Sequence, residues 1–398
     1  MTKRSIETEF VHAGERRPLP NGLPNATPIF ASSTYSYESM EEAERVLSGD
    51  LKDYIYSRYG NPTVDALQDA ICLLEGGAVA RAFASGMAAL HAALLASDLT
   101  GGSFVLASRD LYGASFDLLY KIFGAFGVKT ELVDFADLGE LKRKTEELKP
   151  RVLLAETISN PLLKVLDIAA VAEIAHSFGA KFIVDSTFAT PYLVRPIEFG
   201  ADLVVHSATK YLGGGGDATG GVVIAREIAD EAALTSAMKL AGGILSVWEA
   251  HSISRGLKTL ALRLEKQCSN AEYLAEALSK NDSISKVCYP KFSTDGIAER
   301  VLRKPYNGAL LSIVLRDDTR EAAWRFMNSL KLCVRATTLG DVFTTVSHSA
   351  SSSHRELKEA RRNALGITEG LVRISVGIEN CDDILADIEQ ALSVVSGR

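Results

Sequence analysis

The sequences KFIVD at positions 181–185 and LVVHSATK at 203–210 decide the fold class of this 398-residue chain. Each opens with an apolar run of the length of a buried strand and closes on polar residues, Asp185 in the first and Lys210 in the second. Similar runs alternate with helical stretches between about 63 and 250. This alternation predicts an α/β protein with a mainly parallel sheet, whose ligands gather at the strand ends.

Asp185 and Lys210 together indicate a site for pyridoxal phosphate. A lysine amine can hold the cofactor's aldehyde as a Schiff base, and a carboxylate can keep the ring nitrogen protonated, so that the ring withdraws electrons from a bound amino acid. Either residue alone is more simply explained as a solvated lysine or a helix cap. Ser207 and Thr209 change that balance because they place two hydroxyls beside Lys210, where a phosphate could be bound.

The glycines after Lys210 raise the alternative of a dinucleotide site. Gly213, Gly215 and Ala218 fit G-x-G-x-x-A, but that fingerprint requires a strand before it and a helix after it. Here the glycines follow the lysine and lead into the strand-like run 221–225. The pattern therefore disfavours a nicotinamide cofactor, and the glycines are expected to allow close approach of two chain segments.

Residues 85–87 form a second candidate for phosphate binding. Ser85-Gly86-Met87 precedes the helix-favouring run 88–95. The free amides and the positive dipole end of a helix N-terminus can hold a phosphate dianion. An ordinary helix cap is the alternative, and the presence of Lys210 favours the phosphate interpretation.

Seven ordered motifs resemble the Cys/Met-metabolism (trans-sulfuration) family of pyridoxal phosphate enzymes, which includes methionine γ-lyases, cystathionine γ-lyases and cystathionine γ-synthases. They are HAGE at 12–15, YSRYGNPT at 56–63, SGM at 85–87, ETISNP at 156–161, VDST at 184–187, SATKY at 207–211 and GLVRISVG at 370–377. The resemblance implies an aminotransferase-like fold (fold type I), pyridoxal 5'-phosphate as cofactor, an amino-acid substrate and a homotetramer built from two active dimers.

The chain exceeds the usual single-core size of about 250 to 300 residues, so more than one domain is expected. A continuous helical run is predicted near 247–278, followed by strands at 310–315 and 371–376 of a smaller α+β domain. The predicted divisions are an irregular, turn-rich N-terminal arm at 1–62 that contributes to a neighbouring subunit's site, a pyridoxal phosphate-binding domain at 63–250 and a C-terminal domain at 251–398.

The resemblance also implies roles for single residues. Tyr112 matches a tyrosine that stacks on the cofactor ring and exchanges a proton near the leaving group. Tyr56 and Arg58 match residues that reach the phosphate of a neighbouring subunit, for which the rigid fork of a guanidinium is well suited. Asn160 matches a residue near the cofactor's phenolic oxygen and the substrate carboxylate.

Arg373 interrupts an otherwise apolar strand candidate. Burying an arginine is costly unless it is paired, so an anionic ligand is a physical reason for its presence, beside its match to the family's carboxylate-binding arginine. A structural salt bridge is the alternative. The complete predicted site has three parts: catalytic Lys210, Tyr112 and Asp185; cofactor-binding Lys210, Asp185, Ser85, Gly86, Met87, Tyr112, Asn160, Ser207, Thr209, Tyr56 and Arg58; and substrate-binding Arg373, Thr338 and Asn160.

The predicted reaction is γ-elimination, a carbon–sulfur lyase activity, on a sulfur amino acid such as methionine, homocysteine or cystathionine. γ-Replacement on an O-acylhomoserine is the main alternative, and β-elimination from cystathionine also stays open. A non-catalytic binding or regulatory relative is the alternative of another class. Such a protein would not require Lys210, Asp185, Tyr112 and Arg373 together.

Three positions depart from family patterns where the substrate is chosen. Ala114 stands where methionine γ-lyases commonly have a cysteine, which weakens a strict methionine γ-lyase assignment. Thr337 replaces a glutamate of several cystathionine enzymes, and Phe343 replaces another glutamate found in many relatives. The missing charge at 337 predicts weaker recognition of cystathionine's distal ammonium group.

Composition excludes several other classes of function. A formal net charge of −7 gives no general attraction to nucleic acid or anionic membranes. No apolar run resembles a signal peptide or a membrane span, so a cytoplasmic protein is expected. The five cysteines are dispersed, without C-x-x-C spacing, and are expected to be reduced thiols. His348 and His354 match no metal-binding spacing, and no metal is predicted.

Overall fold

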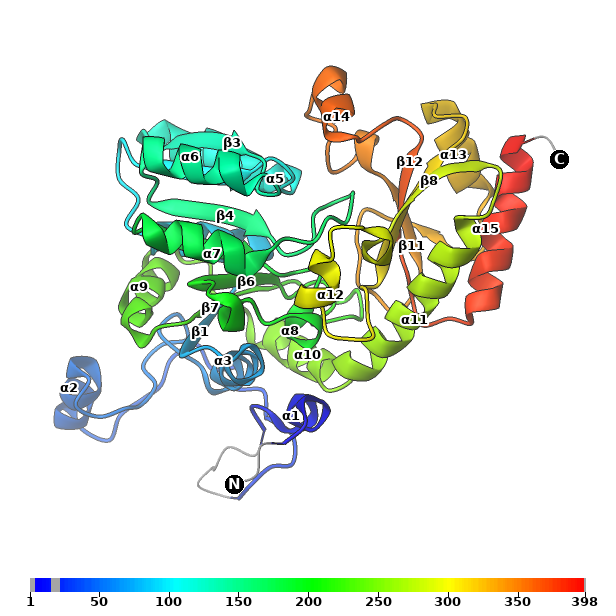
Figure 1. Ribbon diagram of the computed structural model, residues 1–398. Coiled ribbons are helices and arrows are strands. Elements are labelled where there is room, and N and C mark those ends of the chain that lie inside the picture. The colour runs from blue at the N-terminus through cyan, green and yellow to red at the C-terminus, as the bar shows by residue number, and fades with distance from the viewer. Residues whose placement is uncertain (1–3, 16–21, 397–398) are drawn as a thin grey trace.

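The computed structural model of the chain describes residues 4–15 and 22–396. Figure 1 shows two sheets, each with its own helices, and the long helix α11 (Leu260–Leu278) leading from the larger sheet to the smaller one. Parts of the predicted arm, at residues 1–3 and 16–21, lie outside the described residues.

The larger sheet has seven strands in the order β1-β7-β6-β5-β4-β2-β3. The neighbouring pairs from β6 to β3 are parallel, and β7 alone runs against its neighbours. The prediction of a mainly parallel sheet is therefore confirmed. The strands are β1 (Val79–Phe83), β2 (Phe104–Ser108), β3 (Lys129–Val133), β4 (Val152–Glu156), β5 (Lys181–Asp185), β6 (Leu203–Ser207) and β7 (Gly221–Ala225).

Two hydrophobic cores cover the two faces of this sheet. Successive strand residues point to opposite faces, so Leu153 of β4 enters one core and Leu154 the other. The first core is covered by α3 (Pro62–Glu75), α6 (Leu138–Leu148), α7 (Ile168–Ser177) and α10 (Val247–Leu257). The second is covered by α4 (Gly86–Leu95) and α9 (Glu231–Ala241). Shorter helical segments are α5 (Gly113–Asp117), α8 (Thr190–Leu193), η1 (Leu118–Phe123), η2 (Gly124–Phe126), η3 (Pro196–Phe199) and η4 (Ile228–Asp230).

The smaller sheet has five strands in the order β10-β11-β12-β9-β8, and all its neighbouring pairs except β10 with β11 are antiparallel. A third core joins it to α11, α13 (Arg320–Ser329) and α15 (Cys381–Ser396). The strands are β8 (Ile284–Cys288), β9 (Leu310–Leu315), β10 (Val334–Arg335), β11 (Thr345–His348) and β12 (Leu371–Ser375). The remaining helical segments are α12 (Ile297–Val301), α14 (Glu359–Leu365), η5 (Pro290–Phe292) and η6 (Ser349–Ser351).

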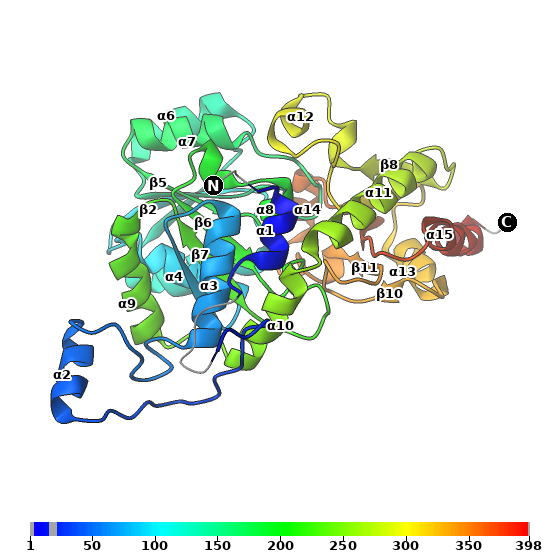
Figure 2. The same ribbon diagram turned by 90° about the horizontal axis from the view of Figure 1, so that it is seen from below.

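The described part of the arm is not wholly irregular, which corrects the prediction. It contains α1 (Ile6–His12), which packs against α3, and α2 (Met40–Ser48), which projects away from both sheets in Figures 1 and 2. Ser39 caps α2 by accepting a hydrogen bond from the Glu42 amide, and Gly49 ends it in the left-handed conformation. A short helix with a local cap can form within a turn-rich segment, and the sequence analysis did not identify this cap.

The helical run predicted near 247–278 is also interrupted. It forms two helices, α10 and α11, separated by Lys258 and Thr259, because Thr259 has a non-helical backbone conformation. The proposed domain boundary at 250 falls inside α10, which packs against α3, and the three divisions stay a prediction. Among the described helices, none is long and apolar enough to cross a lipid bilayer.

Candidate active site

The ends of β5 and β6 place Asp185 and Ser207 at the same edge of the larger sheet. The two strands are parallel neighbours, so their carboxyl ends meet there. Asp185 Oδ1 accepts a hydrogen bond from the Thr187 amide at 2.9 Å, and the Ser207 amide donates to Thr187 Oγ1 at 2.8 Å. Burial raises the pKa of the Asp185 carboxyl. Thr187 thus ties the two turns together, a role that the sequence analysis did not assign.

Lys210 lies three residues beyond β6, on a turn in which its backbone amide donates a hydrogen bond to the Ser207 carbonyl oxygen. Its Nζ donates to Thr338 Oγ1 at 3.1 Å, which brings in a residue from the connection between β10 and β11. Burial lowers the pKa of the Lys210 amine, and the positive charge of Arg373 lowers it further. A larger fraction of the amine is therefore neutral and nucleophilic than in a solvated lysine.

Arg373 on β12 is 4% exposed, and its guanidinium joins the same group of residues. Nη1 donates to Asn160 Oδ1 at 3.0 Å and Nη2 to the Thr338 carbonyl oxygen at 2.9 Å. Nε has no partner within the described chain, and no described carboxylate lies within salt-bridge distance. Burial lowers the pKa of Arg373 to about 10. The alternative of a structural salt bridge thus finds no support among the described residues.

The predicted phosphate cradle is assembled from α4 and the end of β6. Ser85 Oγ accepts from the Ala88 amide at 3.1 Å, which confirms the helix start. The amides of Gly86 and Met87 donate to no described group. A Cβ at Gly86 would lie 2.7 Å from the Ser207 Cβ, so the glycine lets the helix N-terminus lie directly against Ser207.

Thr209 differs from the other predicted phosphate ligands. Its hydroxyl donates to the Gly220 carbonyl oxygen at 3.2 Å and accepts from the Gly220 amide at 3.0 Å. These bonds close the glycine-containing turn that follows Lys210. In this chain the hydroxyl therefore serves the turn itself, and a contact with phosphate stays a prediction.

Tyr112 is held at the site by a residue that the sequence analysis quoted but gave no role. The side chain of Tyr112 is at the N-terminus of α5, the residue is 41% exposed, and its amide donates to Glu156 Oε1 at 2.6 Å. Glu156 closes β4 in register with Asp185 on β5. Burial and the charge of Asp185 raise the pKa of Glu156 well above its usual range. Its place at a strand end, directly after the apolar run 152–155, was the available signal.

Tyr56 and Arg58 do not join this group. Arg58 Nη1 donates to the Lys239 carbonyl oxygen at 3.0 Å, and its guanidinium lies 4.9 Å from the centre of the Tyr59 ring. No hydrogen bond or ion pair among the described residues connects Tyr56 or Arg58 to Lys210. In the described part of the chain, Tyr56 and Arg58 therefore do not complete the site of their own subunit.

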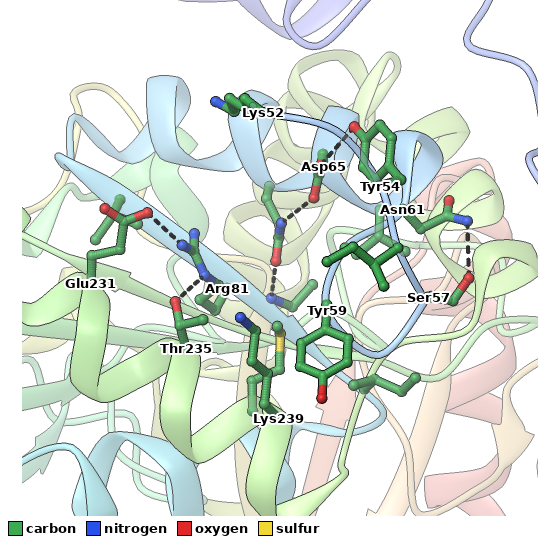
Figure 3. A pocket seen from close by; sticks show the side chains of 18 of the residues that line it. Lys52, Tyr54, Ser57, Tyr59, Asn61, Asp65, Arg81, Glu231, Thr235 and Lys239 are labelled. Carbon is green, nitrogen blue, oxygen red and sulfur yellow. Dashed lines mark hydrogen bonds and ion pairs between the residues drawn. The ribbon is translucent and has the colours of Figure 1, made fainter. Parts of the chain in front are cut away.

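A cavity of about 1470 Å³ lies beneath the arm (Figure 3). Arm residues such as Tyr54 and Tyr59 line one side, and Arg81 of β1 with Thr235 of α9 lines the other. Arg81 donates to Thr235 and pairs with Glu231. None of Lys210, Asp185 and Arg373 lines this cavity, so its volume does not describe the predicted active site.

The three positions that depart from family patterns remain accessible. Thr337 and Phe343 are exposed, the latter by 40%, and Ala114 is half-buried on α5. Thr337 directly precedes Thr338, the residue that contacts both Lys210 and Arg373. A substitution at 337 can therefore reach the edge of the site without replacing one of its buried groups.

Comparisons with known proteins agree with the family resemblance of the sequence motifs. The family model described as Cys/Met metabolism PLP-dependent enzyme matches residues 7–393. The chain is 39% identical over 398 residues to an L-methionine gamma-lyase of Fusobacterium nucleatum subsp. nucleatum, covering 99% of this chain and 100% of that protein. It is 38% identical over 392 residues to a cystathionine beta-lyase of Lactococcus lactis subsp. cremoris, covering 98% and 99%.

A solved structure supports the fold. The cystathionine gamma synthase from Xanthomonas oryzae pv. oryzae, in complex with aminoacrylate and cysteine, matches with a TM-score of 0.93 and 33% sequence identity over 100% of both chains. The likeness confirms the predicted aminotransferase-like, fold type I architecture.

Proposed function

From the premise that this chain belongs to the Cys/Met metabolism family of pyridoxal phosphate-dependent enzymes, we propose that it catalyses γ-elimination from a sulfur amino acid such as methionine. One observation carries the proposal: a buried guanidinium without a carboxylate partner, Arg373, is joined through Thr338 to the half-buried amine of Lys210. An anion bound at Arg373 would place its neighbouring carbon near a base. The relative named L-methionine gamma-lyase supports elimination as the reaction.

The residues at the sheet edge fit pyridoxal 5'-phosphate. Bound through Lys210, the cofactor supplies an electron-withdrawing ring that makes the α-proton of an amino acid acidic. Asp185 can accept the hydrogen bond of the ring nitrogen and stabilise its positive charge. The unpaired amides of Gly86 and Met87 and the hydroxyl of Ser207 provide donors for the phosphate at a helix N-terminus.

The remaining residues divide the proton chemistry between them. Arg373 holds the substrate α-carboxylate, and Asn160, already bonded to Arg373, orients the guanidinium. The lowered pKa of Lys210 leaves its amine ready to accept the α-proton and to return it at another carbon. Tyr112, held by Glu156 through its amide, presents a phenol that can donate a proton to the departing sulfur.

Two other reactions use the same residues. γ-Replacement on an O-acylhomoserine is supported by the structural likeness to a cystathionine gamma synthase, and β-elimination by the relative named cystathionine beta-lyase. A non-catalytic relative is less consistent with a half-buried amine and a buried guanidinium that both bond to Thr338, because ligand binding alone requires no acid–base group.

Product analysis separates these reactions. Purified enzyme would be incubated with L-methionine, L-homocysteine, L-cystathionine or O-acetyl-L-homoserine, with and without an added thiol. γ-Elimination yields 2-oxobutanoate and ammonia, β-elimination from cystathionine yields pyruvate, and γ-replacement yields a thioether without ammonia. We expect 2-oxobutanoate from methionine. Thioether formation as the main reaction would replace the proposal with the γ-synthase alternative.

We further propose a homotetramer of two active dimers in which sites are shared. The placement of Arg58 beside Lys239, away from its own chain's Lys210, supports an arm that serves a neighbouring subunit. Mixing an Arg58→Ala subunit with a Lys210→Ala subunit tests this, because one mixed site would carry both intact residues. Recovery of activity after verified subunit exchange is expected, and continued inactivity would contradict shared sites.

A cytoplasmic location completes the proposal. All five cysteines are unpaired in the structure, as is usual in a reducing compartment. Fractionation of the producing cell against marker enzymes tests it, and recovery of the protein outside the cytoplasmic fraction would contradict it.

A further inference from the structure

A buried carboxyl group near Lys210 has no role in the reaction proposed above. Asp341 lies on the connection between β10 and β11 and is only 2% exposed. Its Oδ1 atom has no hydrogen-bond partner among the described residues. A buried carboxylate is costly unless nearby cations or donors stabilise it, so the charges around Asp341 decide what it does.

The backbone on either side of Asp341 is fixed. Gln267 of α11 donates its Nε2 hydrogen to the Asp341 carbonyl oxygen at 2.8 Å. The Val342 amide donates to the carbonyl oxygen of Gly214, in the glycine turn that follows Lys210, at 3.1 Å. The carboxyl group therefore cannot withdraw without breaking contacts to two other elements.

The same connection packs directly on the turn that carries Lys210. Gly340 has a φ of 83°, and a Cβ there would lie 2.6 Å from the Tyr211 amide nitrogen and 3.1 Å from the Lys210 carbonyl carbon. Only a glycine permits this approach. Thr338, on the same connection, accepts the hydrogen bond of the Lys210 amine. Asp341 is thus held beside Lys210 by the segment that also contacts its side chain.

The charges that act on Lys210 have opposite effects. The cation of Arg373 lowers the pKa of the Lys210 amine, whereas the carboxylate of Asp341 raises it. Asp341 is itself faced by the cation of Arg263, on α11, and by the carboxylate of Asp217, on the glycine turn. Arg263 is anchored by donating Nη1 to the Tyr211 carbonyl oxygen at 2.9 Å.

We propose that Asp341 is a positioning residue that stabilises positive charge on the Lys210 nitrogen and so opposes Arg373. The inference rests on the proposed attachment of the cofactor at Lys210. When a substrate carboxylate neutralises Arg373, the effect of Asp341 is no longer opposed. Lys210 then gains proton affinity at the stage at which it must accept the α-proton.

The test compares Asp341→Asn with the matched variant Asp217→Asn. Asp217 is exposed, and its charge acts on Asp341 without being among those that shift Lys210. The visible absorption of the enzyme with bound pyridoxal phosphate would be measured as a function of pH. The midpoint of the change reports protonation of the Lys210 nitrogen that joins the cofactor. We expect Asp341→Asn to lower this midpoint by about one pH unit. Asp217→Asn should move it by less than about 0.3, because solvent screens an exposed charge.

A second measurement uses the cofactor-free protein, whose Lys210 amine must be neutral to capture added pyridoxal phosphate. The pH at which the capture rate is half-maximal should fall by a similar amount in Asp341→Asn. The inference is overturned if neither midpoint moves in Asp341→Asn, or if Asp217→Asn moves both equally. Visible absorption that persists in Lys210→Ala would instead contradict the attachment site, and so the proposed function.

Discussion

The two sides of the candidate site differ in how their polar groups find partners. At the edge of the larger sheet, Asp185 bonds to Thr187 two positions away, and Ser85 bonds to Ala88 three positions away. On the side of the smaller sheet, Arg373 bonds to Asn160, 213 positions away, and to Thr338, 35 positions away. Local turns and caps form much of the first side, although the Ser207 amide also bonds to Thr187, 20 positions away. On the second side, the described side-chain hydrogen bonds of Arg373 all reach distant segments.

The two sides therefore differ in how far their stability depends on a bound ligand. The turns at Asp185 and Lys210 are held by hydrogen bonds between near neighbours and would form whether or not a ligand is bound, although the amides of Gly86 and Met87 have no partner among the described residues. Arg373 is buried without an anion from the described chain, so its desolvation is compensated only in part. We therefore expect the second side to be less stable in the ligand-free protein than in the protein with a bound carboxylate.

The largest expected effect comes from the sheet-edge side. Lys210→Ala should lower turnover by about 10⁴-fold, at the upper end for a residue that transfers protons. The fold should be retained because the amine lies on a turn outside the strands. Borohydride reduction followed by peptide mapping should place a pyridoxyl group on Lys210 in the parent enzyme. An adduct on a different lysine, or on none, would remove this residue from its proposed role.

On the Arg373 side, a substitution should lower activity without lowering stability. Arg373→Met should lower kcat/KM by about 100- to 1000-fold, since the variant loses a charge-assisted pair of hydrogen bonds to the substrate. Its urea midpoint should be equal to or above that of the parent, because a buried cation without a counter-charge has been removed.

Arg320→Met is the control for this variant. It removes an arginine of α13, beside the smaller sheet, that pairs with Glu369 at the surface. Its kcat/KM should stay within about twofold of the parent, since a surface ion pair contributes little. The comparison fails if Arg373→Met keeps parental kcat/KM.

A pH effect should distinguish the same side. His354 is buried, and burial and then the charges of Arg373 and Arg362 lower the pKa of its ring to about 4. The unfolded chain, with a pKa near 6.5, takes up the proton first, so the stabilisation is present above pH 6.5 and is lost as the pH falls toward 4. Between pH 8 and 5.5 this loss is about 1 kcal/mol.

The measurement is the urea midpoint of the holoenzyme at these two pH values. His354→Asn should lose less stability than the parent on acidification. His251→Asn, on α10, which packs against α3, serves as the control. If His354→Asn and His251→Asn both lose as much stability as the parent when the pH is lowered, buried His354 does not contribute to the pH dependence.

The smallest effect concerns substrate choice at the rim. A charge-assisted hydrogen bond contributes roughly 1.5 to 3 kcal/mol, or ten- to a hundredfold, when fully formed. Thr337 is exposed, so Thr337→Glu should raise kcat/KM for cystathionine by only about three- to tenfold, without improving methionine or O-acetylhomoserine. Thr337→Gln is the uncharged control. A parent that strongly favours cystathionine and gains nothing from glutamate would falsify this expectation.

Features encoded within a few neighbouring residues were predictable from the sequence. The apolar run before Asp185 predicted a strand, and Ser85 before an apolar run predicted a helix start; both are confirmed. The family and its cofactor also followed from ordered motifs and are confirmed by the family match. The cap of α2 at Ser39 is equally local but was not predicted.

Other features were decided by the tertiary structure alone. The pairing of Arg373 with Asn160, the approach of Gly340 to Tyr211 and the burial of Asp341 beside Lys210 join segments from different elements. No pattern within one segment specifies such contacts, because they depend on how sheets and helices pack. The sequence by itself thus determined the main strands of the larger sheet, the family and the cofactor, and it predicted Lys210 as the reactive lysine. Packing determined which charges surround that lysine, and desolvation makes those charges effective.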